Sequence, residues 1–159
     1  MLVLLARRDK TRLGVSPPPS GGFFVGASAS DAASQPGSEI SDEDEIRAVV
    51  LDYVEGWFDG DAGRMDRALH PELVKRCRGL EGDDPDALET LTARDMVDAT
   101  AEGIGRGEDA DDRRIAIDIT NLSDGVASAT CLCHRSVDLL HLIRMPEGWR
   151  IVNAAWCMR

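Results

Sequence analysis

The sequence predicts an α+β domain in which a curved antiparallel sheet is covered on one face by about three N-terminal helices. Apolar residues recur with the period of a helix in segments between residues 41 and 103. From residue 115 onward they alternate with polar residues, as in strands. The helices precede the successive strands, without the strand-helix-strand alternation of a parallel α/β fold, so a helical layer on an antiparallel meander is the expected architecture.

Composition limits the classes of function. The chain has 159 residues and a net charge of −11. Its length is that of one domain. So acidic a chain lacks the clustered Lys and Arg that contact a nucleic acid backbone or an anionic membrane surface. No stretch approaches the roughly 18 apolar residues of a membrane span. We therefore expect a cytoplasmic protein without nucleic acid or membrane partners.

Residues 1–41 and residues 42–159 differ in composition. The first part has four basic and three acidic side chains, and the second carries a net charge of −12. The segments SPPPSGG and GASASDAASQPGS in the first part show no helical or strand period. They bury too little apolar surface to offset the entropy of ordering, so we expect residues 1–41 to be disordered and residues 42–159 to form the domain. A mitochondrial transit peptide and a start assigned too far upstream are the alternatives for residues 1–41.

A first helix is predicted after Ser41, which can form a capping box with Asp44. Tyr53 and Trp57 lie near its other end, on the stripe that faces the core. They are either large core residues or walls of a cavity in which their polar atoms contact a ligand. The full stripe comprises Ile46, Val49, Val50, Tyr53, Val54 and Trp57.

A short second helix should follow, capped by Asp61, with Met65, Ala68 and Leu69 facing inward. The step from His70 to Pro71 disfavours further helix. His70 is expected to anchor this corner by a hydrogen bond, or to reach a pocket.

The middle of the chain is less regular. After a polar loop, Asp84 and Pro85 suit the start of a helix, although LETLTA also suits a short strand. The segment from Thr92 to Gly103 is predicted to be a helix, because Thr92 and Asp95 form a capping-box pattern. Met96, Val97 and Thr100 share one face of it.

The rest of the chain alternates as three or four successive antiparallel strands, with turns at SDG and PEG. Trp149 and Trp156 differ by seven positions, so alternation places them on opposite faces of the last strand, unless both pack in the core. Cys131 and Cys133 share one face and His134 the other. With Cys77 and Cys157, they are expected to be free thiols, since neither a CxxC pair nor a secretory signal is present; zinc is a weak alternative.

Three blocks of the chain resemble the nuclear-transport-factor-2-like superfamily, in particular its branch labelled putative lumazine-binding, near the SnoaL-like proteins. The blocks are IRAVVLDYVEGWFDGDAGRMDRALHPEL, LTARDMVDAT, and VDLLHL followed by GWRIVNAAW. The resemblance implies a cone of curved sheet closed by helices, usually a homodimer, with a cavity between the helices and the concave face. Relatives include ketosteroid isomerases, scytalone dehydratase and polyketide cyclases, so the fold alone decides no reaction.

Catalytic relatives use a carboxylate or histidine in an apolar pocket, often opposite a tyrosine, and Asp138, His134 and His141 are the candidates here. Alternation places Asp138 and His141 on opposite faces of a strand. His134 and Asp138 share a face only if the chain runs straight between them, whereas a hairpin there makes them neighbours or separates them.

Three functions remain open from the sequence. The first is binding of a small apolar or aromatic ligand without catalysis. The second is a cofactor-independent lyase, isomerase or cyclase of the SnoaL-like kind, and the third is a purely structural dimerisation module. No metal or cofactor is expected in any of them. The residues expected to bind the ligand are Tyr53, Trp57, His70, Met96 and Trp156.

Overall fold

The computed structural model describes residues 40–79, 86–106 and 112–159. The prediction of disorder for residues 1–41 lies almost entirely outside these ranges. The helix start proposed at Asp84 and Pro85 lies outside them as well.

Three helices begin and end close to the predicted positions. They are α1 (Asp42–Asp59), α2 (Ala62–Ala68) and α3 (Ala93–Ala101). The side chains of Ser41, Asp61 and Thr92 accept hydrogen bonds from the first turns of α1, α2 and α3 respectively. The capping box of Thr92 and Asp95 is complete. No helix of the described part of the chain is long and apolar enough to cross a membrane.

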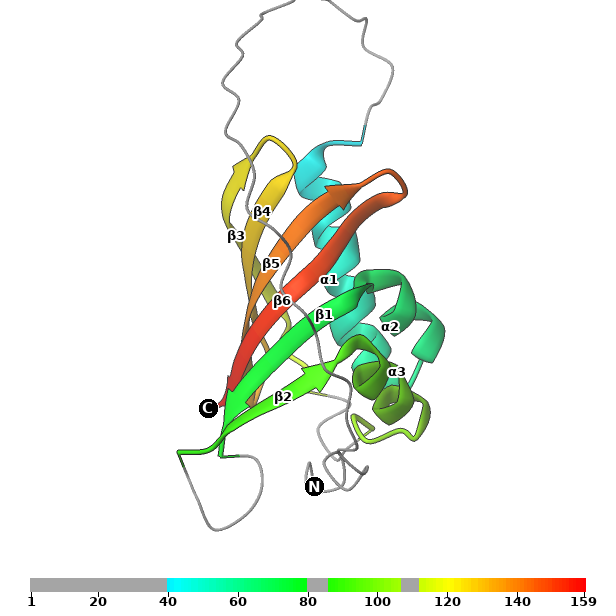
Figure 1. Cartoon of the computed structure of the whole chain (residues 1–159), viewed down its shortest axis with the longest axis vertical. Coiled ribbons are helices and arrows are strands. Elements are labelled where there is room, and N and C mark those ends of the chain that lie inside the picture. The colour runs from blue at the N-terminus through cyan, green and yellow to red at the C-terminus, as the bar shows by residue number, and fades with distance from the viewer. Residues whose placement is uncertain (1–39, 80–85, 107–111) are drawn as a thin grey trace, which may run out of the picture.

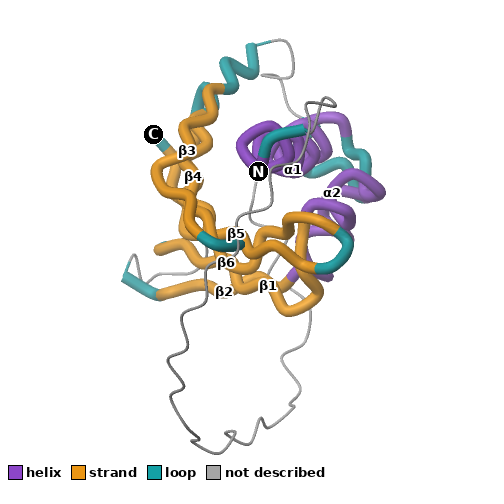
Figure 2. Tube along the Cα trace, turned by 90° about the horizontal axis from the view of Figure 1, so that it is seen from above, coloured by secondary structure: helices purple, strands orange, loops and turns teal. Residues whose placement is uncertain are grey.

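The strands form one six-stranded sheet in the order β2-β1-β6-β5-β4-β3. Neighbouring strands of this sheet are antiparallel, as predicted, except that β1 and β6 are parallel. The sheet is therefore mixed. The helices lie on one side of this sheet, and Figure 2 shows the sheet bending around α1. The strands are β1 (Leu69–Arg78), β2 (Leu88–Thr92), β3 (Ala116–Ser123), β4 (Val126–Leu132), β5 (Ser136–Met145) and β6 (Gly148–Met158).

Strand β1 corrects the predicted polar loop after His70. It lies inside the sheet between β2 and β6 (Figure 1). Its inward positions are Leu73, Lys75 and Cys77, all buried, and they alternate with more exposed neighbours. The sequence left a helix or a short strand open for the LETLTA segment. The structure forms the strand, β2, which leads directly into α3.

Strand β6 contains an irregularity that corrects the prediction for the two tryptophans. His141 of β5 is paired with Asn153, but Leu142 is paired with Ile151, so β6 has one extra residue there. A bulge of this kind shifts the inward and outward alternation by one position. Trp149 and Trp156 therefore both point inward and are both buried.

The core fills the space between the inner sheet face and the apolar stripe of α1. Ile46 and Val50 of α1 are fully buried there, and Met65 of α2 closes one side. Leu140 and Leu142 of β5 meet them from the sheet. This packing covers the end of α1 near Ile46 and leaves a hollow near its other end, beside Tyr53 and Trp57.

Candidate functional site

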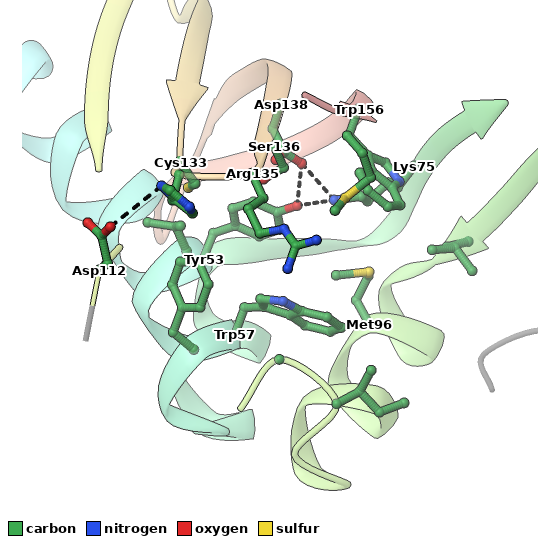
Figure 3. A pocket seen from close by; sticks show the side chains of 17 residues that line it. Tyr53, Trp57, Lys75, Met96, Asp112, Cys133, Arg135, Ser136, Asp138 and Trp156 are labelled. Carbon is green, nitrogen blue, oxygen red and sulfur yellow. Dashed lines mark hydrogen bonds and ion pairs between the residues drawn. The ribbon is translucent and has the colours of Figure 1, made fainter. Parts of the chain in front are cut away.

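A cavity of about 240 Å³ lies between the C-terminal half of α1, α3 and the concave face of the sheet. Figure 3 shows it from close by. Its wall is largely apolar, and three polar side chains, Tyr53, Lys75 and Asp138, lie together on it. The large apolar residues on the wall are Val54, Trp57, Phe58, Leu91, Met96, Ile104, Trp156 and Met158, and its other polar residues are Asp112, His134, Arg135 and Ser136.

The three polar residues form one connected cluster. The Tyr53 hydroxyl donates a 2.8 Å hydrogen bond to Oδ1 of Asp138. The Lys75 ammonium lies 2.6 Å from the same oxygen and also donates to the Tyr53 hydroxyl. Lys75, Asp138 and Tyr53 are only 5%, 6% and 4% exposed. Each buried polar group of the cluster thus has a partner, which offsets part of the cost of its burial.

Two aromatic residues contact the Lys75 ammonium. Its nitrogen lies 5.0 Å from the centre of the Trp156 ring, a distance at which the electrons of a ring face attract a cation. The contact with Tyr53 is made through the hydroxyl at the edge of its ring. The indole N–H of Trp156 is buried without a hydrogen-bond partner among the described residues.

The cluster leaves polar atoms for a ligand. Both contacts of Asp138 use Oδ1, so Oδ2 accepts no hydrogen bond from the described residues. Two of the three ammonium protons of Lys75 are used, by Tyr53 and by Asp138. The cluster therefore presents one hydrogen-bond acceptor beside one charged donor to the cavity.

Burial and the nearby negative charge of Asp138 raise the pKa of Tyr53 well above its ordinary value. Both effects disfavour tyrosinate. The Tyr53 hydroxyl is therefore protonated throughout the physiological pH range, and it acts in the site as a neutral hydrogen-bond donor.

Tyr53 comes from the core stripe of α1, and Asp138 from an inward position of β5, with Leu140 and Leu142 following it on the same face. Sequence reasoning named both residues but missed Lys75, which occupies an apolar position of β1. One signal was available: the chain has only two lysines, Lys10 and Lys75, among 18 basic residues.

Four of the five residues that the sequence predicted to bind a ligand line this cavity. They are Tyr53, Trp57, Met96 and Trp156. Gly105 lies against Trp57, because a Cβ atom built on it would stand only 2.6 Å from the indole Nε1. This close approach fixes the Trp57 ring between α1 and the segment after α3.

His134 lies at the edge of the cavity in the hairpin between β4 and β5, so the chain does turn between His134 and Asp138. Its Nδ1 is 3.6 Å from a carboxylate oxygen of Asp112. No hydrogen bond or ion pair within the described residues joins it to Asp138. The acid-base pair of these two residues, one of the sequence alternatives, is therefore not assembled.

The structure places His141 and His70 away from the cavity. His141 lies on the outer face of β5, where its Nδ1 is 3.3 Å from the side-chain nitrogen of Asn153. His70 anchors its corner as predicted, because its Nδ1 accepts a 3.1 Å hydrogen bond from the backbone of Glu72. It lines a separate hollow beside α3.

Cys131 and Cys133 share the inner face, as alternation predicted, and both are buried free thiols. Cys133 also lines the cavity. A hydrogen bond between the two thiols raises the pKa of Cys131 and lowers that of Cys133. Within residues 40–79, 86–106 and 112–159, no three His, Cys, Asp or Glu side chains form a group that could hold a metal ion.

The family model described as "Putative lumazine-binding" matches residues 41–157. The chain belongs to this family. The match covers all three helices and nearly all of the sheet, including every residue of the polar cluster. The resemblance stated from three blocks of sequence is thereby confirmed. No curated protein is similar enough in sequence to match the chain.

Solved structures confirm the fold of this family member. An NTF2-like protein of unknown function from Shewanella baltica superposes with a TM-score of 0.61 at 14% identity, over 78% of this chain and 98% of its own. An NTF2-like protein of unknown function from Methylobacillus flagellatus gives 0.56 at 21% identity, over 76% and 94%. A protein described as a putative aromatic ring hydroxylase from Novosphingobium aromaticivorans gives 0.52 at 9% identity, over 77% and 92%. At such identities the similarity shows the fold alone.

Proposed function

We propose that this protein binds a flat, largely apolar small molecule with one polar edge in the cavity beside α1. The observation that carries the proposal is a buried charged cluster placed on the wall of a largely apolar cavity. A cavity needed only to complete the core would be filled more stably by apolar side chains, because burying Lys75 and Asp138 costs solvation energy.

The dimensions and polarity of the cavity restrict the ligand. Its volume of about 240 Å³ lies below the roughly 300–1,000 Å³ that is common for ligand sites. A molecule of one or two fused rings is therefore favoured. Trp57 and Met96 offer flat and adaptable apolar contact, and Asp138 Oδ2 beside the Lys75 ammonium suits an edge with one donor and one acceptor.

Native mass spectrometry of the protein purified from its own host tests this function. We expect a small molecule that is retained in the folded protein and released on denaturation. Tyr53→Phe removes the hydroxyl that holds Asp138 and Lys75 in position, and Trp57→Leu removes a ring contact, so each should weaken binding about tenfold. His141→Ala, on the outer face of the sheet, is the matched control and should leave the affinity unchanged. Variants that lower thermal stability without altering binding would return Tyr53 and Trp57 to a role in the core.

Acid-base catalysis is the second candidate function, and the Asp138–Tyr53 hydrogen bond at the apolar cavity favours it. Asp138 would take a proton from carbon and the Tyr53 hydroxyl would stabilise the oxyanion that results. Incubation of the bound ligand in deuterated water tests this function. Deuterium should enter a C–H bond with the wild-type protein and not with Asp138→Asn, and retention of every C–H hydrogen by the wild type would leave binding alone.

We further propose that the protein acts as a cytoplasmic homodimer, joined through the outer face of the sheet. Leu139, Ile143 and Val126 are exposed there, and Val126 is paired with Ile143 across the two strands. Apolar groups that gather on one face are typical of an interface. The net charge of −11 supports a protein without membrane or nucleic acid partners. If no ligand is bound, dimerisation alone is the remaining function.

A further inference from the structure

Lysine is rare in this chain, and one of its two lysines lies on the cavity wall. Sixteen of the 18 basic residues are arginines, and the only lysines are Lys10 and Lys75. Lys75 is the single lysine of the described residues, and it is buried against the cavity. Lysine can release its proton and become a nucleophile, whereas arginine remains protonated in proteins. An ion pair with Asp138 alone would not require this choice.

We infer that Lys75 forms an imine with a carbonyl group of the ligand. This inference rests on the proposed ligand-binding function and adds the class of ligand, an aromatic or otherwise flat aldehyde or ketone. Its basis is the position of the Lys75 nitrogen on the cavity wall, with a carboxylate oxygen at 2.6 Å and a hydroxyl group in contact.

Each step has a group in place to carry it. Asp138 takes one proton from the Lys75 ammonium along the existing hydrogen bond, which leaves a neutral amine with a free electron pair. The amine nitrogen attacks the carbonyl carbon, and one of its two protons passes to the carbonyl oxygen, which becomes the hydroxyl of a neutral carbinolamine. Asp138 returns its proton to that hydroxyl, which leaves as water while the C=N bond forms. The net change joins one amine and one carbonyl and releases one water, with no oxidant or reductant.

The surroundings of the nitrogen suit the product as well as the amine. A protonated imine carries its positive charge on the same nitrogen, where the Trp156 ring and the Asp138 carboxylate already stabilise an ammonium. The apolar wall formed by Trp57 and Met96 excludes water, which would otherwise hydrolyse the C=N bond.

Reductive trapping tests the inference in the full-length protein. The probe is 2-naphthaldehyde with sodium cyanoborohydride, followed by peptide mapping with mass spectrometry. The other primary amines, on Lys10 and at the N-terminus, serve as internal references for the rate at which Lys75 is modified. We expect Lys75 to be modified at least about tenfold faster than Lys10, through proximity in the bound complex. Lys75→Arg should lose this adduct and keep the one at Lys10.

The two levels of the proposal fail separately. Binding of 2-naphthalenemethanol, which has the same ring and no carbonyl, is measured alongside by thermal shift. If the alcohol binds while Lys75 is modified no faster than Lys10, the imine is excluded and ligand binding stands. The rate comparison uses the wild-type protein, so it does not depend on whether Lys75→Arg folds, and equal rates overturn the imine in every case.

Discussion

Tyr53 is the only tyrosine of the chain, so ultraviolet absorbance reports its ionisation alone. Burial and the Asp138 charge raise its pKa in the folded state. We predict that tyrosinate forms near pH 10 in urea but only at clearly higher pH in the folded protein. The stabilisation is complete below about pH 10 and is lost as the pH rises toward the folded-state pKa, at up to about 1.4 kcal/mol per pH unit.

The same titration has an internal control. Tyr53→Phe should abolish the absorbance change and this component of the alkaline loss of stability. A folded wild-type protein that forms tyrosinate at the same pH as in urea would show that the hydroxyl is open to solvent, and the cluster would then be wrong.

The buried ion pair gives a second prediction for single residues. Lys75→Met should lower the free energy of unfolding by about 3–5 kcal/mol, because it leaves the Asp138 carboxylate buried without its cation. Lys75→Met combined with Asp138→Leu should restore much of this loss. Urea denaturation measures both variants.

Arg78→Met is the control for the ion pair, since Arg78 and Asp86 form a pair in which both side chains are largely exposed. This change should affect stability little. If the double variant were as unstable as Lys75→Met alone, the loss would come from packing of the lysine chain and not from an unpaired charge.

At the scale of elements, the contact between α1 and α2 depends on a glycine. A Cβ atom on Gly56 would lie 3.1 Å from the backbone nitrogen of Met65 and 3.2 Å from the carbonyl oxygen of Asp61. These backbone atoms cannot rotate away. We predict that Gly56→Ala lowers stability, by about 1–2 kcal/mol, although alanine favours an isolated helix over glycine by about 1 kcal/mol.

Gly63 in α2 is the matched control. Its nearest atoms would be side-chain atoms of Asp61 and Arg67, at 3.3 Å and 3.8 Å. Gly63→Ala should therefore raise the midpoint of thermal unfolding while Gly56→Ala lowers it. A rise with both substitutions would show that α2 moves freely on α1.

The helices and most strands were predictable because their local signals agree with the fold. Caps at Ser41, Asp61 and Thr92 give three helix starts, and period-two alternation gives the meander from Ala116 to Met158. Strand β1 was missed because Pro71 and its charged residues suggest a loop, and because its parallel partner β6 begins about 70 residues away.

The site was predicted in part for the same physical reason. Tyr53 and Asp138 lie at positions that local periodicity places inward, so both could be named. Lys75 occupies a position where an apolar side chain is expected, and only the folded cavity explains the charge there. The two tryptophans were separated by alternation, which does not foresee a bulge.

At the scale of the whole molecule, the outer face of the sheet carries a prediction. Leu139, at the centre of this face, is 53% exposed. Leu139→Lys should convert the proposed dimer to a monomer, because it places a charge in an apolar interface. Light scattering coupled to size exclusion gives the mass directly.

Ile40→Lys is the control for the dimer, since Ile40 is exposed and lies just before α1, outside the strands of the sheet. It should leave the mass unchanged. A wild-type protein with the mass of one chain, or a Leu139→Lys variant that remains a dimer, would contradict the proposed interface.

The central position of β6 in the sheet bears on how the protein folds. β6 is paired with β1 on one side and β5 on the other, and it carries the Trp156 ring that covers Lys75. Without β6, the sheet separates into β2-β1 and β5-β4-β3. No strand then connects Lys75 on β1 to Asp138 on β5, which lie 63 positions apart in the sequence. During synthesis the site therefore cannot form until β6 has left the ribosome, so ligand can bind only after all six strands have been made.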